Sequence, residues 1–401
     1  MAGGLLTRWS GLQDGGVLGI NARNRRYVMR YNPRHKYPLV DDKLTTKRLA
    51  LEAGLAVPEL YGAVRFQGEL IKLDRLLDGL DSFVIKPAHG SGGDGVLVVT
   101  DRRRGLYIKG DGRALMLRDI EYFVSNILSG VHSLGGIPDA AMIEYRVRPS
   151  RLFDALSYRG VPDIRLLIFR GIPTMAMVRL PTRASDGKAN LHQGAVGVGI
   201  ALATGVTGHG VVRDQLIGEH PDFGTRLTGH AIPDWEALLA VGARCADLTG
   251  LGYCGVDLVL DEERGPMMLE VNARPGLAIQ IANQCGLERR LGAIEAMQTL
   301  PTDIGERIAL ARALDEAERP QASAGAVAAA KTGEPAPEPA VTSSRQVASE
   351  SAQEPLSVWM SGPETAATPK PAPLRRKARR VLTARTSADA PTERRARSGQ
   401  A

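Results

Sequence analysis

The chain has 401 residues, of which 43% are hydrophobic and 24% charged, so it can bury a large core spread over two or three domains. Most of its net charge of +7 lies beyond residue 320, and the nearly balanced body does not have the charge of a nucleic-acid binder. No apolar run approaches the roughly 20 residues of a membrane span, and Met1–Ile20 lacks the apolar stretch of a secretory signal.

The first segment, residues 1–36, is expected to form a basic arm, because it is too short for a core of its own. Two interpretations remain open for it: a cationic strip along a cleft that takes an acidic substrate, or an ordinary solvated face. Its second half, with Tyr27, Tyr31 and the following Tyr37 interleaved, contains the basic residues Arg23, Arg25, Arg26, Arg30, Arg34 and Lys36.

A glycine-rich turn follows between two apolar segments in Ser82–Val99 and predicts a strand, a tight loop and a second strand. Four glycines in six residues let the backbone approach an anion closely, and successive N–H groups can hold phosphate oxygens. The residues that we expect to contact phosphate here are Lys86, Gly90, Ser91, Gly92 and Gly93. The alternative is an ordinary glycine-rich hairpin, since the pattern is neither a P-loop nor a protein-kinase loop.

Two later strands, 254–260 and 268–272, are joined by a polar turn and predict a hairpin that places Asp257 opposite Glu270. Asn272 lies two residues after Glu270 and therefore on the same strand face. Carboxylate and amide oxygens are the ligands that Mg²⁺ prefers, so these three residues are a candidate site for Mg²⁺ or Mn²⁺. The alternative is a buried carboxylate satisfied by other partners.

Helices are predicted from Pro233, where apolar residues recur at helical spacing, and at Thr302–Glu318. Residues 321–401 are rich in Ala, Pro, Ser, Thr and Glu and are expected to be a disordered, basic tail. That tail either touches an anionic partner or only solubilises the chain. Cys245, Cys254 and Cys285 form no CxxC pair, which favours reduced thiols, a cytoplasmic location and no zinc site.

The order of these motifs resembles the ATP-grasp superfamily from about Tyr37 to about Leu291. The residues Pro38–Lys47 and Ala53–Pro58 are similar to the family's opening, and Ala141–Val147 is similar to its interdomain hinge. Asp163–Arg165 and Lys188–Gly194 look most like the RimK-type branch, and the nearest resemblance is to alpha-L-glutamate ligase-like proteins.

The resemblance implies an α+β, ATP-grasp fold in which two α+β subdomains clasp ATP. It divides the chain into the arm at 1–36, an N-terminal segment at 37–81, a small lid at 82–145, a large subdomain at 146–320 and the tail at 321–401. It also implies that Lys43 and Lys86 contact the nucleotide, that Glu144 and the Val147 backbone edge the adenine, and that Asp163 lies near the ribose or phosphates. The residues implied to bind the transferred phosphate or the activated carboxylate are Arg165, Lys188, Asn190 and Arg274.

The implied activity is an ADP-forming ligation of a carboxylate to an amine through an acyl phosphate, one version being the addition of glutamate to a peptide, protein or small amine. A kinase on the same scaffold and a non-catalytic adaptor acting through the basic tail are the alternatives. The family has arginine where this chain has Lys188, and a lysine lacks the bidentate fork that recognises carboxylates. Two further points stay open: Arg165 as a surface ion-pair partner of Asp163, and His192 as a base or as a structural residue.

Overall fold

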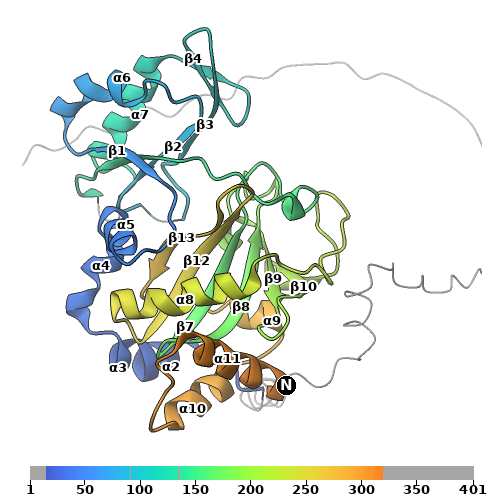
Figure 1. Cartoon of the computed structure of the whole chain (residues 1–401). Coiled ribbons are helices and arrows are strands. Elements are labelled where there is room, and N and C mark those ends of the chain that lie inside the picture. Colours follow the sequence, from blue (N-terminus) through green and yellow to red (C-terminus); the bar gives the residue numbers. More distant parts are fainter. Residues whose placement is uncertain (1–14, 91, 134–135, 319–401) are drawn as a thin grey trace, which may run out of the picture. The chain divides into compact units, whose positions relative to one another are not determined.

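Two antiparallel sheets organise the chain in the computed structural model, which describes residues 15–90, 92–133 and 136–318 (Figure 1). Within those residues the smaller sheet has six strands in the order β1-β6-β2-β3-β4-β5. Its strands are β1 (Leu60–Val64), β2 (Phe83–Pro87), β3 (Leu97–Arg103), β4 (Leu106–Lys109), β5 (Ala114–Leu115) and β6 (Ala141–Glu144).

The strand–loop–strand prediction for the glycine-rich segment is confirmed, because β2 and β3 pair antiparallel on either side of it. The edge strand β1 pairs with β6, so this sheet uses residues on both sides of the expected boundary at 81/82. Helices cover the apolar face of the sheet. Phe83 and Ile85 of β2 are fully buried there against Ile120 and Val124 of the helical layer. The helical segments here are η3 (Gln67–Lys72), α6 (Leu73–Leu76) and α7 (Leu117–Leu128).

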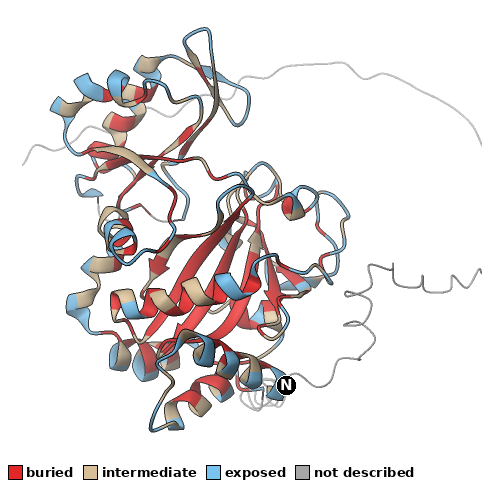
Figure 2. Cartoon of the chain, in the orientation of Figure 1, coloured by how far each residue is buried: buried red, intermediate tan, exposed pale blue. Residues whose placement is uncertain are grey.

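The larger sheet has seven strands among the described residues, in the order β11-β10-β9-β8-β7-β12-β13. Central strands such as β7 and β12 are buried along their whole length, as the red strands of Figure 2 show. The strands are β7 (Asp163–Phe169), β8 (Ile172–Leu180), β9 (Val196–Ile200), β10 (Thr207–Val212), β11 (Gln215–Ile217), β12 (Tyr253–Asp261) and β13 (Gly265–Asn272).

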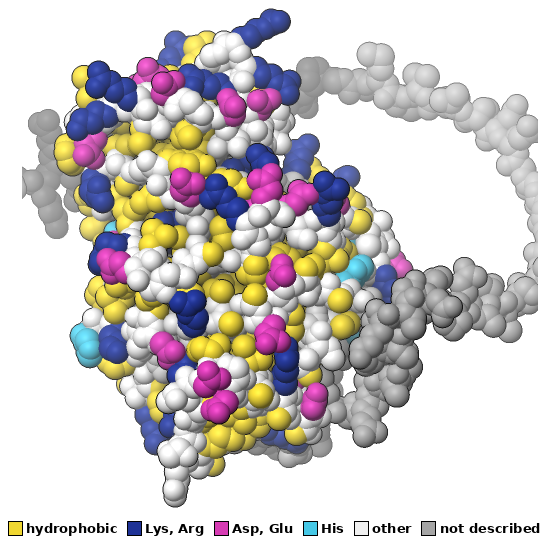
Figure 3. Space-filling view, in the orientation of Figure 1, with side chains coloured by type: hydrophobic (Ala, Val, Ile, Leu, Met, Phe, Trp, Pro, Cys, Tyr) yellow, Lys and Arg dark blue, Asp and Glu magenta, His cyan; other side chains and the backbone are white. Residues whose placement is uncertain are grey.

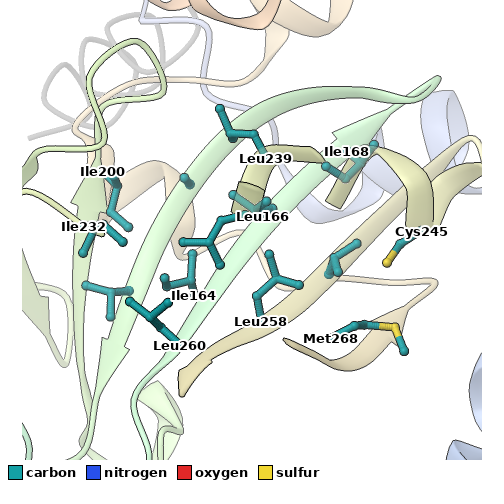
Figure 4. Packing of buried hydrophobic residues seen from close by; sticks show 14 of the residues in the cluster. Ile164, Leu166, Ile168, Ile200, Ile232, Leu239, Cys245, Leu258, Leu260 and Met268 are labelled. Atoms are coloured by element: carbon teal, nitrogen blue, oxygen red, sulfur yellow. The ribbon is translucent and has the colours of Figure 1, made fainter. Parts of the chain in front are cut away.

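One face of this sheet packs against α8 (Trp235–Thr249), the helix predicted from Pro233. Figure 4 shows Leu239 and Cys245 of α8 in one apolar cluster with Leu166 and Ile168 of β7. Because strand side chains alternate between faces, Ile164, Leu166 and Ile168 all point toward the helix. The odd-numbered residues of β7 therefore belong to the opposite face.

The opposite face is covered at one end by the helical segments around Tyr27 and by α9 (Ile279–Asn283), α10 (Glu288–Ala296) and part of α11 (Ile304–Glu318). Val40, Ala50 and Ile308 instead belong to the cluster on the α8 face. Tyr27 packs edge-on against Phe169 with ring centroids 5.4 Å apart, and stacks on Tyr253 at 5.9 Å. Aromatic pairs of this kind stabilise by about 0.5–1.5 kcal/mol beyond the area they bury. The N-terminal helical segments are α2 (Ile20–Arg23), η1 (Asn24–Val28), α3 (Met29–Tyr31), η2 (Arg34–Lys36), α4 (Pro38–Asp41) and α5 (Lys43–Glu52).

This packing engages three of the N-terminal arginines that could form a cationic strip. Arg23 is buried, and its guanidinium donates to the Pro275 carbonyl. Arg26 and Arg30 pair with Glu288 and Glu295 of α10, each at 2.7 Å. These three guanidiniums are therefore engaged within the chain, because their helix docks on the sheet instead of lying along a cleft.

Surface charge on the face drawn in Figure 3 is mixed, with Lys and Arg interspersed among Asp and Glu. No helix among the described residues has the length and apolarity needed to cross a membrane. The expected tail at 321–401 lies outside the described residues.

Candidate functional site

The glycine loop between β2 and β3 has the backbone geometry that close approach to an anion requires. Gly92, Gly93 and Gly95 have φ of 69°, 80° and 72°, values that side-chain-bearing residues rarely adopt. The loop is fixed at its start by Lys43, whose Nζ donates to the Gly90 carbonyl at 2.5 Å. Ser91, which we expected to contact phosphate, lies outside the described residues.

Lys86 ends its strand beside Glu144 at the end of β6, with Nζ 2.5 Å from Oε1. Lys47 of α5 lies on the other side of the same carboxylate, with Nζ 2.9 Å from Oε2, as an ion pair whose angle is not that of a hydrogen bond. Burial alone would raise the pKa of Glu144, but the two ammonium groups hold it below its usual range. Burial lowers the pKa of Lys47, and Glu144 partly offsets that effect.

The hinge after β6 carries the other residue that we expected near adenine. Val147 is buried in a small cluster with Tyr145, Val259 and Met267, where the segment crosses to the large sheet. Its packing fixes the course of the backbone that follows Glu144.

The predicted hairpin is confirmed, with β12 and β13 paired antiparallel and Asp257 directly opposite Glu270. Asn272 Nδ2 donates to Asp257 Oδ2 at 3.2 Å, so Asn272 also lies in this cluster. Lys43 Nζ is 3.7 Å from Glu270 Oε1. Lys43 therefore connects the start of the glycine loop to the metal-ligand candidates on the large sheet.

Asp257 is held by two arginines from the neighbouring strands. Arg165 of β7 grips it with two nitrogens, one of them Nη2 at 2.7 Å from Oδ2. Arg179 of β8 adds Nη2 at 2.8 Å from Oδ2, and also forms a two-nitrogen contact with Asp163. The expected alternative, in which Arg165 pairs with Asp163, is wrong, because Arg165 lies across from Asp257 in the sheet register.

The electrostatic consequences differ for the two acids. Burial raises the pKa of Asp163 against the effect of Arg179, and the adjacent Asp257 carboxylate adds to the rise. Burial would also raise the pKa of Asp257, but Arg165 and Arg179 together hold it below its usual range. Asp257 is thus the more firmly ionised of the two, since it accepts from two guanidiniums and an amide.

The donor set fits Mg²⁺ in part. Glu270 offers a carboxylate, and Asn272 turns its amide oxygen away from Asp257, because the amide nitrogen makes the hydrogen bond. Asp257 has the right chemistry, but both of its oxygens accept from guanidinium groups, so it must exchange a partner to take a cation. The described residues contain no cluster of three or more His, Cys, Asp or Glu side chains suited to a metal.

Lys188 and Asn190 reach the glycine loop from the large-sheet side. Lys188 Nζ is 2.7 Å from Asp94 Oδ1, and Asn190 Nδ2 donates to the Gly92 carbonyl at 3.3 Å. Asn190 also accepts from the His192 backbone at the start of η6 (Leu191–Gln193), while His192 itself is exposed. The two segments expected to handle phosphate therefore lie against each other.

Arg274 is exposed, with its guanidinium carbon 5.0 Å from the Tyr37 ring centroid. Neither a hydrogen bond nor an ion pair joins it to Asp163, Asp257 or Lys188 among the described residues. Of the expected substrate-binding residues, Arg274 is the one that the structure does not bring into the polar clusters.

Two residues of these clusters were not among the candidates from sequence. Lys47 follows Lys43 by one helical turn, and that spacing, which places both on one helix face, was the available signal. Arg179 is a lone charge inside the apolar strand β8, and such a residue requires a buried partner. Both signals are local, but their partners are distant in sequence.

A family model described as sugar-transfer associated ATP-grasp matches residues 22–296. Among curated proteins, none matches the chain. Solved structures similar to it include the ATP-grasp ligase PsnB complexed with minimal precursor (14% identity, 66% of this chain and 63% of that chain, TM-score 0.37). Another is the D-cycloserine synthetase DcsG (16% identity, 65% of this chain and 73% of that chain, TM-score 0.37). A third is the D-alanine–D-alanine ligase from Bacillus anthracis complexed with ATP (14% identity, 70% of this chain and 68% of that chain, TM-score 0.33).

The chain thus spans less than two thirds of the length of PsnB, and at these identities and TM-scores the family assignment rests on the family model. That model covers both sheets, the glycine loop and the hairpin with Glu270. The chain therefore belongs to the sugar-transfer associated ATP-grasp family and has an α+β, ATP-grasp fold.

Proposed function

We propose that this protein is an ADP-forming ligase that joins a carboxylate to an amine at the expense of ATP. The observation that carries the proposal is the position of Lys43, whose Nζ contacts both Gly90 of the phosphate-type loop and Glu270 of the metal-ligand candidates. A single cation between an anion-binding loop and paired oxygen ligands is the arrangement that phosphoryl transfer needs.

In the first step, a carboxylate oxygen of the substrate attacks the γ-phosphorus of ATP, the bond to the bridging oxygen breaks, and ADP leaves. Lys86 and the glycine loop hold the phosphates, and Lys47 shares with Lys86 the charge of Glu144. Arg165 and Arg179, which hold Asp257 and Asp163, are the candidates for neutralising the charge of the acyl phosphate. Asp257, Glu270 and Asn272 would hold Mg²⁺, which neutralises phosphate charge when bound.

In the second step, an amine attacks the acyl carbon, phosphate leaves, and the nitrogen loses one proton to water. No side-chain nucleophile is needed, because the acyl phosphate is already activated. Water must be excluded until the amine arrives, and the contacts of Lys188 and Asn190 with the loop support a loop that closes over the intermediate. Lys188 and Arg274 are the candidates for binding the substrate carboxylate.

For the substrates, we propose an amino acid such as glutamate as one partner and a peptide, a protein or a small amine as the other. The resemblance of Asp163–Arg165 and Lys188–Gly194 to RimK-type ligases supports this choice. The family description associates these proteins with sugar transfer and names no substrate. Because ATP is the proposed co-substrate, we place the reaction in the cytoplasm.

The test is to incubate the chain with Mg·ATP, candidate carboxylates and a panel of amines, and to measure ADP, phosphate and products by mass spectrometry. A ligase releases phosphate only when both substrates are present, and with carboxylate alone hydroxylamine traps the acyl phosphate as a hydroxamate. A stable phosphorylated product without phosphate release, across the whole amine panel, would replace the ligase with a kinase. Lys86→Ala should suppress either reaction.

A further inference from the structure

His89, the residue directly before Gly90 of the glycine loop, has an ordered imidazole that the proposed reaction has not used. Its Nδ1 is 2.7 Å from Asp139 Oδ1, and its backbone N–H donates to the same carboxylate at 3.0 Å. The Asp139 side chain has no exposed surface, whereas 47% of the His89 side chain is exposed. A buried carboxylate therefore fixes Nδ1 of a half-exposed ring.

The backbone around His89 is fixed on both sides. Ala88 N donates to the Ala140 carbonyl at 2.9 Å, and Lys43 N donates to the Ala88 carbonyl at 3.1 Å. On the other side, Lys43 Nζ holds the Gly90 carbonyl. The imidazole thus stands on a rigid base at the entrance of the loop, as a preorganised ligand contact requires.

A purely structural role for Asp139 would be satisfied by the backbone N–H groups of His89 and Ala140, both of which it accepts. The additional hydrogen bond to the imidazole orders a half-exposed ring, and little burial offsets the entropy of that ordering. A ligand bound at Nε2 would explain why Asp139 orders the His89 ring through Nδ1.

The lysines Lys43, Lys86 and Lys188 beside the loop already have partners within the chain. Lys86 contacts Glu144, Lys43 contacts the Gly90 carbonyl, and Lys188 contacts Asp94. By contrast, Nε2 of His89 forms no hydrogen bond with any residue that the structure describes. An imidazolium Nε2–H beside an anion-binding loop suits a phosphate oxygen.

We propose that His89 is a phosphate-contacting residue of the glycine loop and that Asp139 is its positioning residue, which holds Nδ1–H so that Nε2 faces a nucleotide phosphate. The inference rests on the proposed function, because it takes a nucleoside diphosphate as the ligand. It adds to that function a contact that Lys43, Lys47 and Lys86 do not provide.

The test compares binding of Mg·ADP and of adenosine to the full chain by calorimetry. In His89→Asn the amide can still donate to Asp139, but Nε2 is lost. We expect its affinity for Mg·ADP to fall about tenfold, the loss of one charge-assisted hydrogen bond, with adenosine binding unchanged.

His89→Gln, which places an amide near the position of Nε2, should recover part of the affinity, and Asp139→Asn should weaken Mg·ADP binding in the same direction. His209→Asn, at an exposed position on β10, is the matched control and should bind as wild type does. Wild-type affinity for Mg·ADP in His89→Asn would overturn the inference but not the proposed function. A wild-type chain that binds no Mg·ADP would overturn the proposed function as well. Should His89→Asn fail to fold, the Gln and Asp139 variants decide the same comparison.

Discussion

Glu144 is a carboxylate whose side chain is 4% exposed, placed between the two ammonium groups of Lys47 and Lys86. Each of the three charges would be costly to bury alone, and the group is stable only because its members compensate one another. The Glu144 carboxylate also holds Lys86 in place near the end of β2, beside the glycine loop.

We predict that Glu144→Gln destabilises the fold by about 3–5 kcal/mol near neutral pH, because it leaves two buried lysines without a counter-charge. The lowered pKa of Glu144 contributes stability that is present above the ordinary carboxyl pKa of about 4.3 and is lost as the pH falls through the folded-state value. The difference between variant and wild type should therefore shrink in acid. Urea denaturation between about pH 3 and about pH 7 measures it.

The matched control is Glu52→Gln, which removes an exposed ion pair with Arg48 one helical turn away. Its effect should stay within about 0.5 kcal/mol at every pH, because exposed pairs contribute little. A variant of Glu144 as stable as the Glu52 variant would show that the lysines do not depend on this carboxylate.

We predict that Asn272→Leu keeps the fold and loses Mg²⁺-dependent turnover, because it removes an oxygen ligand beside Glu270 and only one hydrogen bond of 3.2 Å to Asp257. Asn272→Asp retains an oxygen ligand and should keep part of the turnover. Thermal melting and ATP consumption at several Mg²⁺ concentrations separate the two effects. Wild-type turnover in the leucine variant would rule out this residue as a metal ligand.

At the scale of elements, local pattern was enough to predict the hairpin but not its partners. Alternating apolar residues and a polar turn placed Asp257 opposite Glu270, and the register agrees. The arginines that grip Asp257 come from β7 and β8, about 90 residues away in sequence for Arg165, and strand order is not encoded locally.

The N-terminal helices illustrate the same limit. Their abundant arginines dominate the sequence, whereas Tyr27 and Val28 decide where the segment packs. The apolar surface that receives them, which includes Phe169 and Tyr253, is assembled from two strands far along the chain. A basic arm and a docked helix therefore have the same local sequence pattern.

Arg290 of α10 forms a buried link to α11, with Asp315 at 2.8 Å and Glu318 at 2.5 Å. The side chains of Arg290 and Asp315 are 2% and 0% exposed, so solvent does not screen the pair. We predict that Arg290→Met destabilises the fold by about 3–5 kcal/mol, because two carboxylates lose their cation. Urea denaturation of this variant and of Glu288→Gln, an exposed pair on the same helix, gives the comparison.

The Glu288 variant should change stability by no more than about 1 kcal/mol, since its partner Arg26 is largely exposed. Equal stability of the Arg290 and Glu288 variants would show that α10 and α11 are held together by apolar contacts alone.

At the scale of the whole molecule, the family match covers 22–296, while the packing extends through α11 to Glu318. Ile308 and Ala311 of α11 are buried in the two clusters on opposite faces of the large sheet. The motifs were sufficient to predict the ATP-grasp fold, because the glycine loop, the hinge and the hairpin follow one another along the chain in the order that the family shows. The domain boundaries at 36/37, 81/82, 145/146 and 320/321 remain our proposal.

We predict that removing residues 321–401 changes the melting temperature by no more than about 2 °C, because both sheets and the described hydrophobic clusters are complete without them. The removed sequence has few large apolar residues with which to bury surface. A chain ending at Leu300 is the control, since it also loses Ile308, Ala311 and the carboxylate of Asp315, and should melt far lower. Calorimetry of the full chain, the chain without residues 321–401 and the chain ending at Leu300 gives the three melting temperatures. A large drop in melting temperature on removing 321–401 alone would mean that this segment packs on the body.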